Sequence, residues 1–153
     1  MRLHGFSSLI AGVLFVFAEG CKDIGEPDLQ PTPARTIHSS YGYKAYDAVG
    51  SLVVTGRMDV SLSSDSTISG GWNFVAAGKD GSVIGPQVGS GKLVGSVQNN
   101  RWFINLNPEW VDNNVFLNGS LGDEGIGGIW NWSTFKGPTA SGTFEALPIL
   151  SVM

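Results

Sequence analysis

Tryptophan is the residue type best suited to bind a ligand in this sequence of 153 residues. Four of the five tryptophans, and one phenylalanine, fall on the apolar side of stretches that alternate in polarity: Trp72, Trp102, Trp130, Trp132 and Phe144. Alternate residues of a strand share one face, so these rings are predicted to point inward. Inward rings either fill a core or line a pocket for an apolar or ring-bearing ligand, and both interpretations stay open.

The fifth tryptophan is predicted to lie in a loop. Trp110 follows Pro108 and Glu109, between two alternating stretches. An exposed loop tryptophan is a candidate contact for a partner protein or a sugar. The alternative is that its ring covers the mouth of the domain.

Neither a catalytic group nor a metal site is predicted. His38 is the only histidine after the first 20 residues, and it has no second histidine or cysteine nearby to complete a zinc site. Paired carboxylates can hydrolyse glycosides, but the available acids fall mostly in turns or on polar faces. We therefore expect a protein that is not an enzyme and needs no cofactor, with a carboxylate-dependent hydrolase as the weaker alternative. The acids concerned are Asp59, Glu109, Asp112, Asp123, Glu124 and Glu145.

The charge of the chain argues against nucleic-acid binding. The formal net charge is −4, and lysines and arginines are scattered singly. A nucleic-acid interface needs a basic stripe to neutralise phosphates. With nucleic acid not expected, the expected partners are a small apolar ligand or an envelope protein.

The N-terminus is predicted to direct export. Residues 1–20 hold a short polar start and an apolar run over residues 9–18, which is too short to span a bilayer comfortably and suits a secretory signal. Cys21, the only cysteine, follows Gly20 directly. This small residue and lone cysteine at the end of an apolar run resemble the lipobox of bacterial lipoproteins. That resemblance implies lipid attachment at Cys21 and a membrane-anchored protein of the cell envelope, at the outer membrane or cell surface. An unpaired thiol is the alternative.

A proline-rich segment separates Cys21 from the remaining sequence. Residues 21–35 include Pro27, Pro31 and Pro33, and proline favours extended backbone without hydrogen bonds to neighbouring strands. We expect a tether over 21–35, a single domain over 36–147 and a short tail over 148–153.

Period-two alternation over the domain predicts an all-β fold. Leu52, Val54, Met58, Val60 and Leu62 share one predicted core face, and six further stretches alternate in the same way. Tyr41 and Tyr43 allow an eighth, short edge strand. Because the connections are mostly short, we expect an antiparallel up-and-down β-barrel of about seven or eight strands, with a β-sandwich as the alternative.

Glycines on the predicted core face favour the barrel. Glycine weakens a strand unless the strand must bend or another group needs the room. A closed barrel supplies both reasons, because its strands curve and aromatic rings can lie over glycines of neighbouring strands. The glycines concerned are Gly56, Gly70, Gly95, Gly119, Gly128 and Gly142.

The pattern of glycine and aromatic residues is similar to that of known small barrels. Gly70-Gly-Trp72, Gly128-Ile-Trp130 and the closing Gly142-Thr-Phe144 resemble bacterial lipocalin-like and avidin-like barrels. The resemblance implies a ligand-binding barrel, but it carries over neither a ligand nor a set of contact residues.

Overall fold

The structure, a computed structural model, describes residues 35–78 and 83–149. The predicted signal sequence, the lipid site Cys21 and nearly all of the tether lie outside these ranges. The described residues form eight strands and no helix; within them, accordingly, no helix is long and apolar enough to cross a membrane. The strands are β1 (Ile37–Tyr46), β2 (Leu52–Leu62), β3 (Thr67–Ala76), β4 (Gly89–Gln98), β5 (Arg101–Asn105), β6 (Asn113–Leu121), β7 (Ile126–Thr134) and β8 (Gly137–Pro148).

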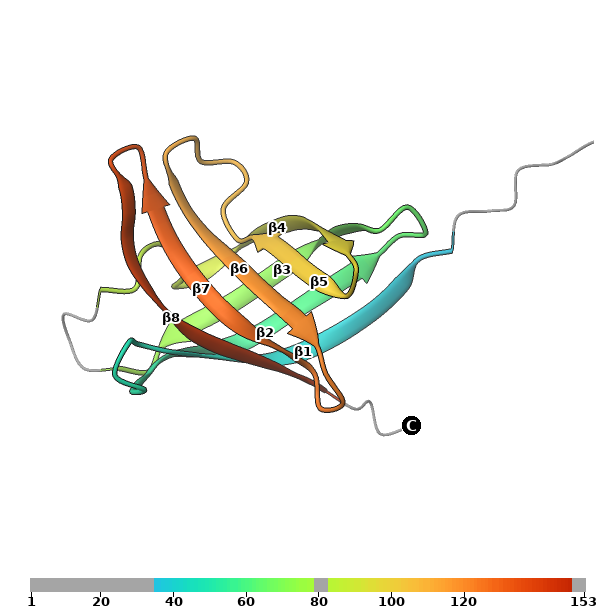
Figure 1. Ribbon diagram of the computed structural model, residues 1–153, viewed down its shortest axis with the longest axis horizontal. Coiled ribbons are helices and arrows are strands. Elements are labelled where there is room, and N and C mark those ends of the chain that lie inside the picture. The colour runs from blue at the N-terminus through green and yellow to red at the C-terminus, as the bar shows by residue number, and fades with distance from the viewer. Residues whose placement is uncertain (1–34, 79–82, 150–153) are drawn as a thin grey trace, which may run out of the picture. The chain divides into compact units, whose positions relative to one another are not determined.

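The eight strands close into an antiparallel barrel in sequence order (Figure 1). Each strand pairs with the next, and β1 pairs with β8 from Tyr41↔Pro148 to Tyr46↔Thr143. The predicted up-and-down barrel is confirmed, and the sandwich alternative is wrong. The stretch around Tyr43 is a ten-residue strand paired on both sides, not the short edge strand expected.

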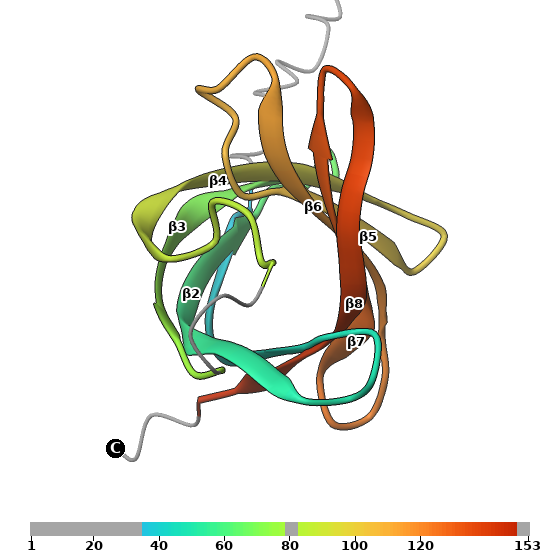
Figure 2. The ribbon, with the colours of Figure 1, turned by 90° about the vertical axis from the view of Figure 1, so that its left-hand side faces the viewer.

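The barrel has two different ends. Because the strands run antiparallel in order, the connections 47–51, 77–88, 106–112 and 135–136 all lie at one end, which we call the loop end. The connections 63–66, 99–100 and 122–125 lie at the opposite end, the turn end. Figure 2 looks at the loop end and shows its connections arranged around the barrel opening.

The core consists of the inward residues of all eight strands, and it agrees with the predicted alternation except at the start of β2. There, Leu52 is exposed while Val53 and Val54 are both buried. The cause is a bulge in β2 at Val53, because Ala45 pairs with Val54 but the next residue of β1, Tyr46, pairs with Leu52. A bulge of this kind leaves one residue unpaired and changes which side chains face inward. The assignment of Leu52 to the core face was therefore wrong.

The predicted glycines sit where the barrel wall leaves no space for a side chain. A Cβ added at Gly128 would collide with the carbonyl oxygen of Asn118, and one at Gly142 with that of Tyr46 and, at 2.7 Å, with Nε1 of Trp130. The predicted placement of an aromatic ring over glycine holds at Gly142, and close approach of the neighbouring strand is a further reason that was not predicted.

Candidate functional site

A gap in the barrel wall creates the most distinctive hollow at the loop end. Strand β5 is the shortest of the eight, and its pairing with β4 runs only from Val94↔Asn105 to Gln98↔Arg101. The first five residues of β4, 89–93, therefore extend beyond the end of β5. The connection that follows β5 lies beside them and leaves a hollow of about 140 Å³, which we call the wall cleft.

Trp72 forms the floor of the wall cleft. Its indole Nε1 donates a hydrogen bond to the carbonyl oxygen of Leu106 at 2.6 Å and a longer one, 3.2 Å, to that of Lys92. Gly91 pairs with Trp72 across β3 and β4, and a Cβ at this glycine would lie 3.0 Å from three atoms of the indole ring. Glycine at position 91 therefore keeps part of the ring open to the cleft.

Residues of the loop after β5 form the opposite side of the cleft. Trp110 is 52% exposed and lines it together with Pro108 and Glu109. The Glu109 carboxylate lies 2.8 Å from Nζ of Lys92, and the hydrogen bond between them raises the pKa of that lysine. Both side chains of this ion pair are mostly in water, so it adds little stability. It places one charge of each sign at the rim of a hollow that combines the two tryptophans with the polar residues Ser90 and Asn107.

The loop after β5 is held in place by asparagine side chains. Oδ1 of Asn107 accepts a hydrogen bond from the backbone N–H of Val115 on β6, and its Nδ2 donates to the carbonyl oxygen of Pro86 at 3.0 Å. Nδ2 of Asn114 donates to the carbonyl oxygen of Trp110 at 2.9 Å. Asn107 therefore joins the two longest connections of the loop end, and Asn114 fixes the backbone that carries Trp110.

The described part of the connection between β3 and β4 reaches into the barrel interior. Gln87 has no exposed surface, and its Oε1 accepts a hydrogen bond from the hydroxyl of Tyr43 at 3.2 Å. Its Nε2 donates to the carbonyl oxygen of Ile84 at 2.7 Å, within the same loop. Burial raises the pKa of Tyr43 far above its usual range, so the hydroxyl stays protonated and remains a donor.

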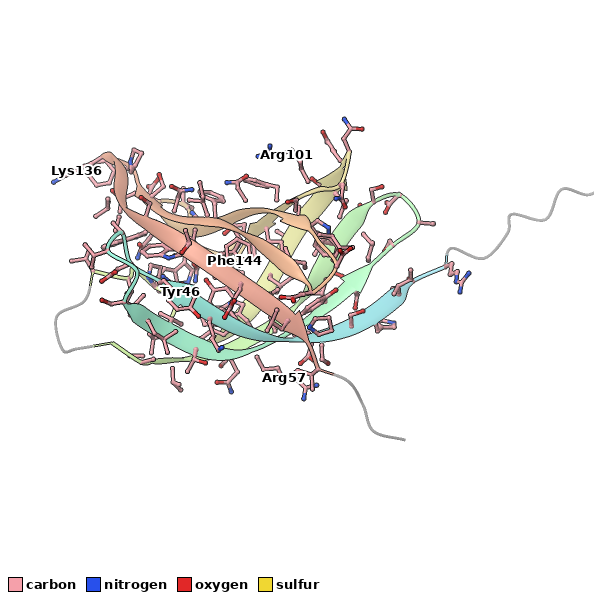
Figure 3. All side chains as sticks on the ribbon, turned by 60° about the horizontal axis from the view of Figure 1, so that its bottom comes forward. Tyr46, Arg57, Arg101, Lys136 and Phe144 are labelled. Atoms are coloured by element: carbon pink, nitrogen blue, oxygen red, sulfur yellow. The ribbon has the colours of Figure 1, made fainter. Side chains whose placement is uncertain are left out.

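Aromatic rings fill the interior below Gln87. The ring of Tyr43 stacks on Phe74 with ring centres 4.2 Å apart, and Phe144 stacks on Tyr43 at 5.9 Å. Trp72 continues the series with its ring 5.0 Å from Phe74. Figure 3 shows Phe144 within the barrel, surrounded by other side chains. An eight-stranded barrel has an interior just wide enough to be filled by side chains or to hold one small ligand, and here the rings occupy that space.

The five rings predicted to bind a ligand do not gather around one hollow. Trp72 lines the wall cleft, Trp130 donates its Nε1 to the carbonyl oxygen of Tyr46, and Trp132 donates to Oδ1 of Asn113. Phe144 belongs to the stacked interior. Trp102 lies near the turn end, beside a shallow hollow of about 360 Å³ that it shares with Arg101 and Asn118. Trp110, the predicted partner contact, lies across the wall cleft from Trp72.

Three carboxylates share a hollow at the turn end. Asp123, Glu124 and Glu145 line a depression of about 540 Å³. Hydrogen bonds from the Tyr46 hydroxyl and from Lys44 lower the pKa of Glu145, which favours its ionised form. An acid catalyst must hold its proton, so this environment suits a surface ion pair rather than a general acid. Within residues 35–78 and 83–149, no group of three or more histidines, cysteines and acids is placed to hold a metal.

Three residues of the loop end escaped the sequence interpretation. Gly91 carries a signal that can be recognised afterwards, because it precedes the alternating residues of β4 and pairs with a tryptophan. Gln87 and Asn107 carry none, since a buried amide in a loop has no periodicity.

Comparisons with known proteins add no family to this picture: no family model matches the sequence, and neither does any curated protein.

Proposed function

We propose that this protein is an exported, lipid-anchored, non-enzymatic binding barrel of the cell envelope that captures a small ring-bearing ligand in the wall cleft. One observation carries the proposal: Trp72, which is 6% exposed, and Trp110, which is 52% exposed, line the same hollow at the loop end of the barrel. Aromatic side chains in a concave site favour apolar rings.

The size of the cleft limits the ligand to about one ring. A cavity of about 150 Å³ in another protein holds one benzene molecule, and the wall cleft has about 140 Å³. At about 0.7 kcal/mol per heavy atom, a six-atom ring gains about 4 kcal/mol, which corresponds to a Kd on the order of 1 mM. Tighter binding requires a longer ligand that also reaches the Lys92–Glu109 pair at the rim.

The test follows the indole N–H signals of the five tryptophans in a ¹H–¹⁵N NMR spectrum. Cyclohexanol serves as the apolar ring and methyl glucoside as the polar ring. We expect the signals of Trp72 and Trp110 to shift with at least one probe, while Trp102, near the other end, serves as the internal control. Shifts of equal size at all five tryptophans, or at none, would refute the site.

Two variants with a matched control locate the ligand. Gly91→Ala places a methyl group against the Trp72 ring, and Trp110→Ala removes the opposite wall, so each is expected to abolish the shifts. Gly71→Ala is the control, because its Cβ meets only the carbonyl oxygen of Gly91, at 3.5 Å. Binding that survives both cleft variants would place the ligand elsewhere.

The packed interior favours a second candidate function, a protein-interaction module that uses the loop end. Tyr43 and Gln87 are fully buried, so the rings below them act as a core. Native and denaturing mass spectrometry of the protein purified from cells separates the two candidates. A small mass present only in the native spectrum supports ligand capture, and a co-purifying polypeptide supports the interaction module.

The anchor is tested separately from the barrel. We expect a labelled fatty acid to be incorporated into the wild-type chain in a bacterial host and to be absent from Cys21→Ser. Equal labelling of the two chains would remove the lipid anchor from the proposal and leave the binding site unaffected.

A further inference from the structure

Exposed apolar residues occur at the tips of separate connections, all at the loop end. Val49 is 86% exposed in the connection between β1 and β2, and Phe135 is 76% exposed between β7 and β8. Between β5 and β6, Trp110 is 52% and Val111 90% exposed. We call these four the tip residues. These four side chains stay in water after folding. None of them belongs to the core, so the barrel does not need them to be apolar in order to fold.

The turns at the opposite end have polar tips. Their residues are Ser63–Ser66, Asn99–Asn100 and Gly122–Gly125. The exposed apolar residues near that end lie on strands or directly after β8 rather than at turn tips: Ile37, Leu121, Leu147 and Ile149. The apolar tips therefore distinguish one end of the barrel from the other and are not a general property of its connections.

Part of the backbone beside each tip already has an internal hydrogen-bond partner. Oδ1 of Asp47 accepts from the N–H of Val49 and of Ser51, at 3.0 and 2.8 Å. The Asn114 amide donates to the carbonyl oxygen of Trp110 at 2.9 Å. Oγ1 of Thr134 accepts from the N–H of Lys136 at 3.3 Å. In each connection a polar side chain replaces water for the backbone beside the tip.

This arrangement meets a requirement that lipid imposes. A backbone polar group without a partner costs several kcal/mol in hydrocarbon, so only connections with satisfied backbones can enter it. A partner protein does not impose the same requirement, because it brings donors and acceptors of its own and traps water. The internally bonded tips therefore favour a lipid surface over a protein.

The charges beside the tips suit the interface between headgroups and acyl chains. Nζ of Lys136 lies 5.7 Å from the centre of the Phe135 ring, on a stem long enough to keep the ammonium at the headgroups. Asp47 and Asp112 lie beside the other tips, so these three residues together carry a formal charge of −1. A mixed, nearly neutral rim favours zwitterionic lipid and limits insertion to about 5–10 Å.

From these observations we infer that the loop end docks on a lipid bilayer by inserting Val49, Trp110, Val111 and Phe135 into the boundary between headgroups and acyl chains. The predicted tether permits this orientation, although β1 begins at the turn end. About 16 residues separate Cys21 from Ile37 and can extend to about 55 Å, whereas a ten-residue strand is about 33 Å long. The inference does not depend on the proposed ligand, because Val49, Val111 and Phe135 lie outside the wall cleft.

The test uses the full chain and vesicles of phosphatidylcholine, with and without bromine on the acyl chains. Bromine quenches only tryptophans that reach the acyl region, and all five tryptophans of the chain belong to the barrel. Co-sedimentation with the vesicles gives the bound fraction of each variant, so the quenching of the bound chains reports the contact made by the loop end itself. We expect brominated lipid to quench part of the wild-type emission and to quench none of it in Trp110→Phe.

Substitutions at the other tips complete the test. Phe135→Ser and Val49→Ser are expected to reduce the quenched share, by about tenfold for the phenylalanine. Val75→Ser is the matched control, since Val75 is 54% exposed on the outer face of β3 and belongs to a strand rather than to a tip. Thermal melting confirms that each variant is folded.

Three outcomes would overturn the inference. The first is that wild-type emission is not quenched. The second is that Val75→Ser reduces quenching as much as Phe135→Ser does. The third is a self-association seen by analytical ultracentrifugation without lipid and abolished by the tip variants, which would assign the same surface to a second copy of the chain. The NMR test of the wall cleft contains no vesicles, so the two proposals can fail independently.

Discussion

The hydrogen bond between Tyr43 and Gln87 provides a quantitative test of whether the loop really fills the barrel interior. Both side chains are fully buried, and the bond is 3.2 Å long. Tyr43→Phe removes the donor and leaves a buried amide oxygen without its partner, which costs about 1–3 kcal/mol. Gln87→Met keeps the approximate side-chain shape and leaves the tyrosine hydroxyl and the Ile84 carbonyl oxygen unpaired, at a similar cost.

The double variant is expected to be more stable than the sum of the two single effects predicts. In the double variant both the hydroxyl and the amide are gone, so no buried polar group is left without its partner at this contact. The coupling free energy between the two substitutions should therefore be about 1 kcal/mol. Urea unfolding followed by tryptophan fluorescence measures all three variants. In a domain of this size each kcal/mol also lowers the melting temperature by about 4 °C.

Tyr46→Phe is the matched control for this cycle. It makes the same chemical change on the outer face of β1, where the hydroxyl donates to Glu145 at 2.8 Å and water is within reach. We expect it to destabilise the protein less than Tyr43→Phe does. Equal effects at the two tyrosines, or strict additivity in the double variant, would show that water reaches the Tyr43 hydroxyl and that Gln87 does not seal the interior.

Three further predictions test other parts of the structure. Because burial raises the pKa of Tyr43, the unfolded chain loses this proton above about pH 10 while the folded chain keeps it. Urea unfolding should therefore show stability falling by up to about 1.4 kcal/mol per pH unit above pH 10, and Tyr43→Phe should remove that contribution. Gly128→Ala should destabilise the barrel by about 1–3 kcal/mol, whereas Gly127→Ala, whose Cβ has its nearest contact at 3.8 Å, should change stability little in the same assay. Asn107→Ala should speed hydrogen exchange in residues 83–88, because it removes the bond to Pro86.

The fold could be predicted because its main determinants repeat along the sequence. Alternation of period two is set by the strand itself, so Met58, Val60 and Trp72 were placed on the correct face without knowledge of their neighbours. The inward glycines indicated that the sheet closes into a barrel, because glycine is favoured on a core face where strands curve and other groups need the room. The full length of β1 was not predicted, because only Tyr41 and Tyr43 showed a clear alternation in this part of the sequence.

The candidate site depends on contacts that no local pattern encodes. Gln87 is buried because a tyrosine 44 positions earlier offers it a hydrogen bond. The wall cleft exists because β5 ends at Asn105, after which the Asn107 side chain supplies the acceptor that binds the Val115 N–H. A side chain that substitutes for the partner strand looks, in the sequence, like any other loop asparagine. Only the register of β4, β5 and β6 together shows that the wall is open there.

The candidate site lies in the wall of the barrel rather than along its axis. Residues that contact a ligand there are therefore largely different from those that stabilise the fold. The rings on the axis are stacked and covered by Gln87, so removing one of them should unfold the barrel before it affects a ligand. The wall cleft is bordered by a loop and by residues 89–93 of β4, which pair with β3 but not with β5, and a substitution in that loop disturbs few core contacts. Binding at the cleft can therefore change through Trp110 and its neighbours while the stacked core stays constant. The loop end is consequently where we expect both the ligand and the lipid surface to act.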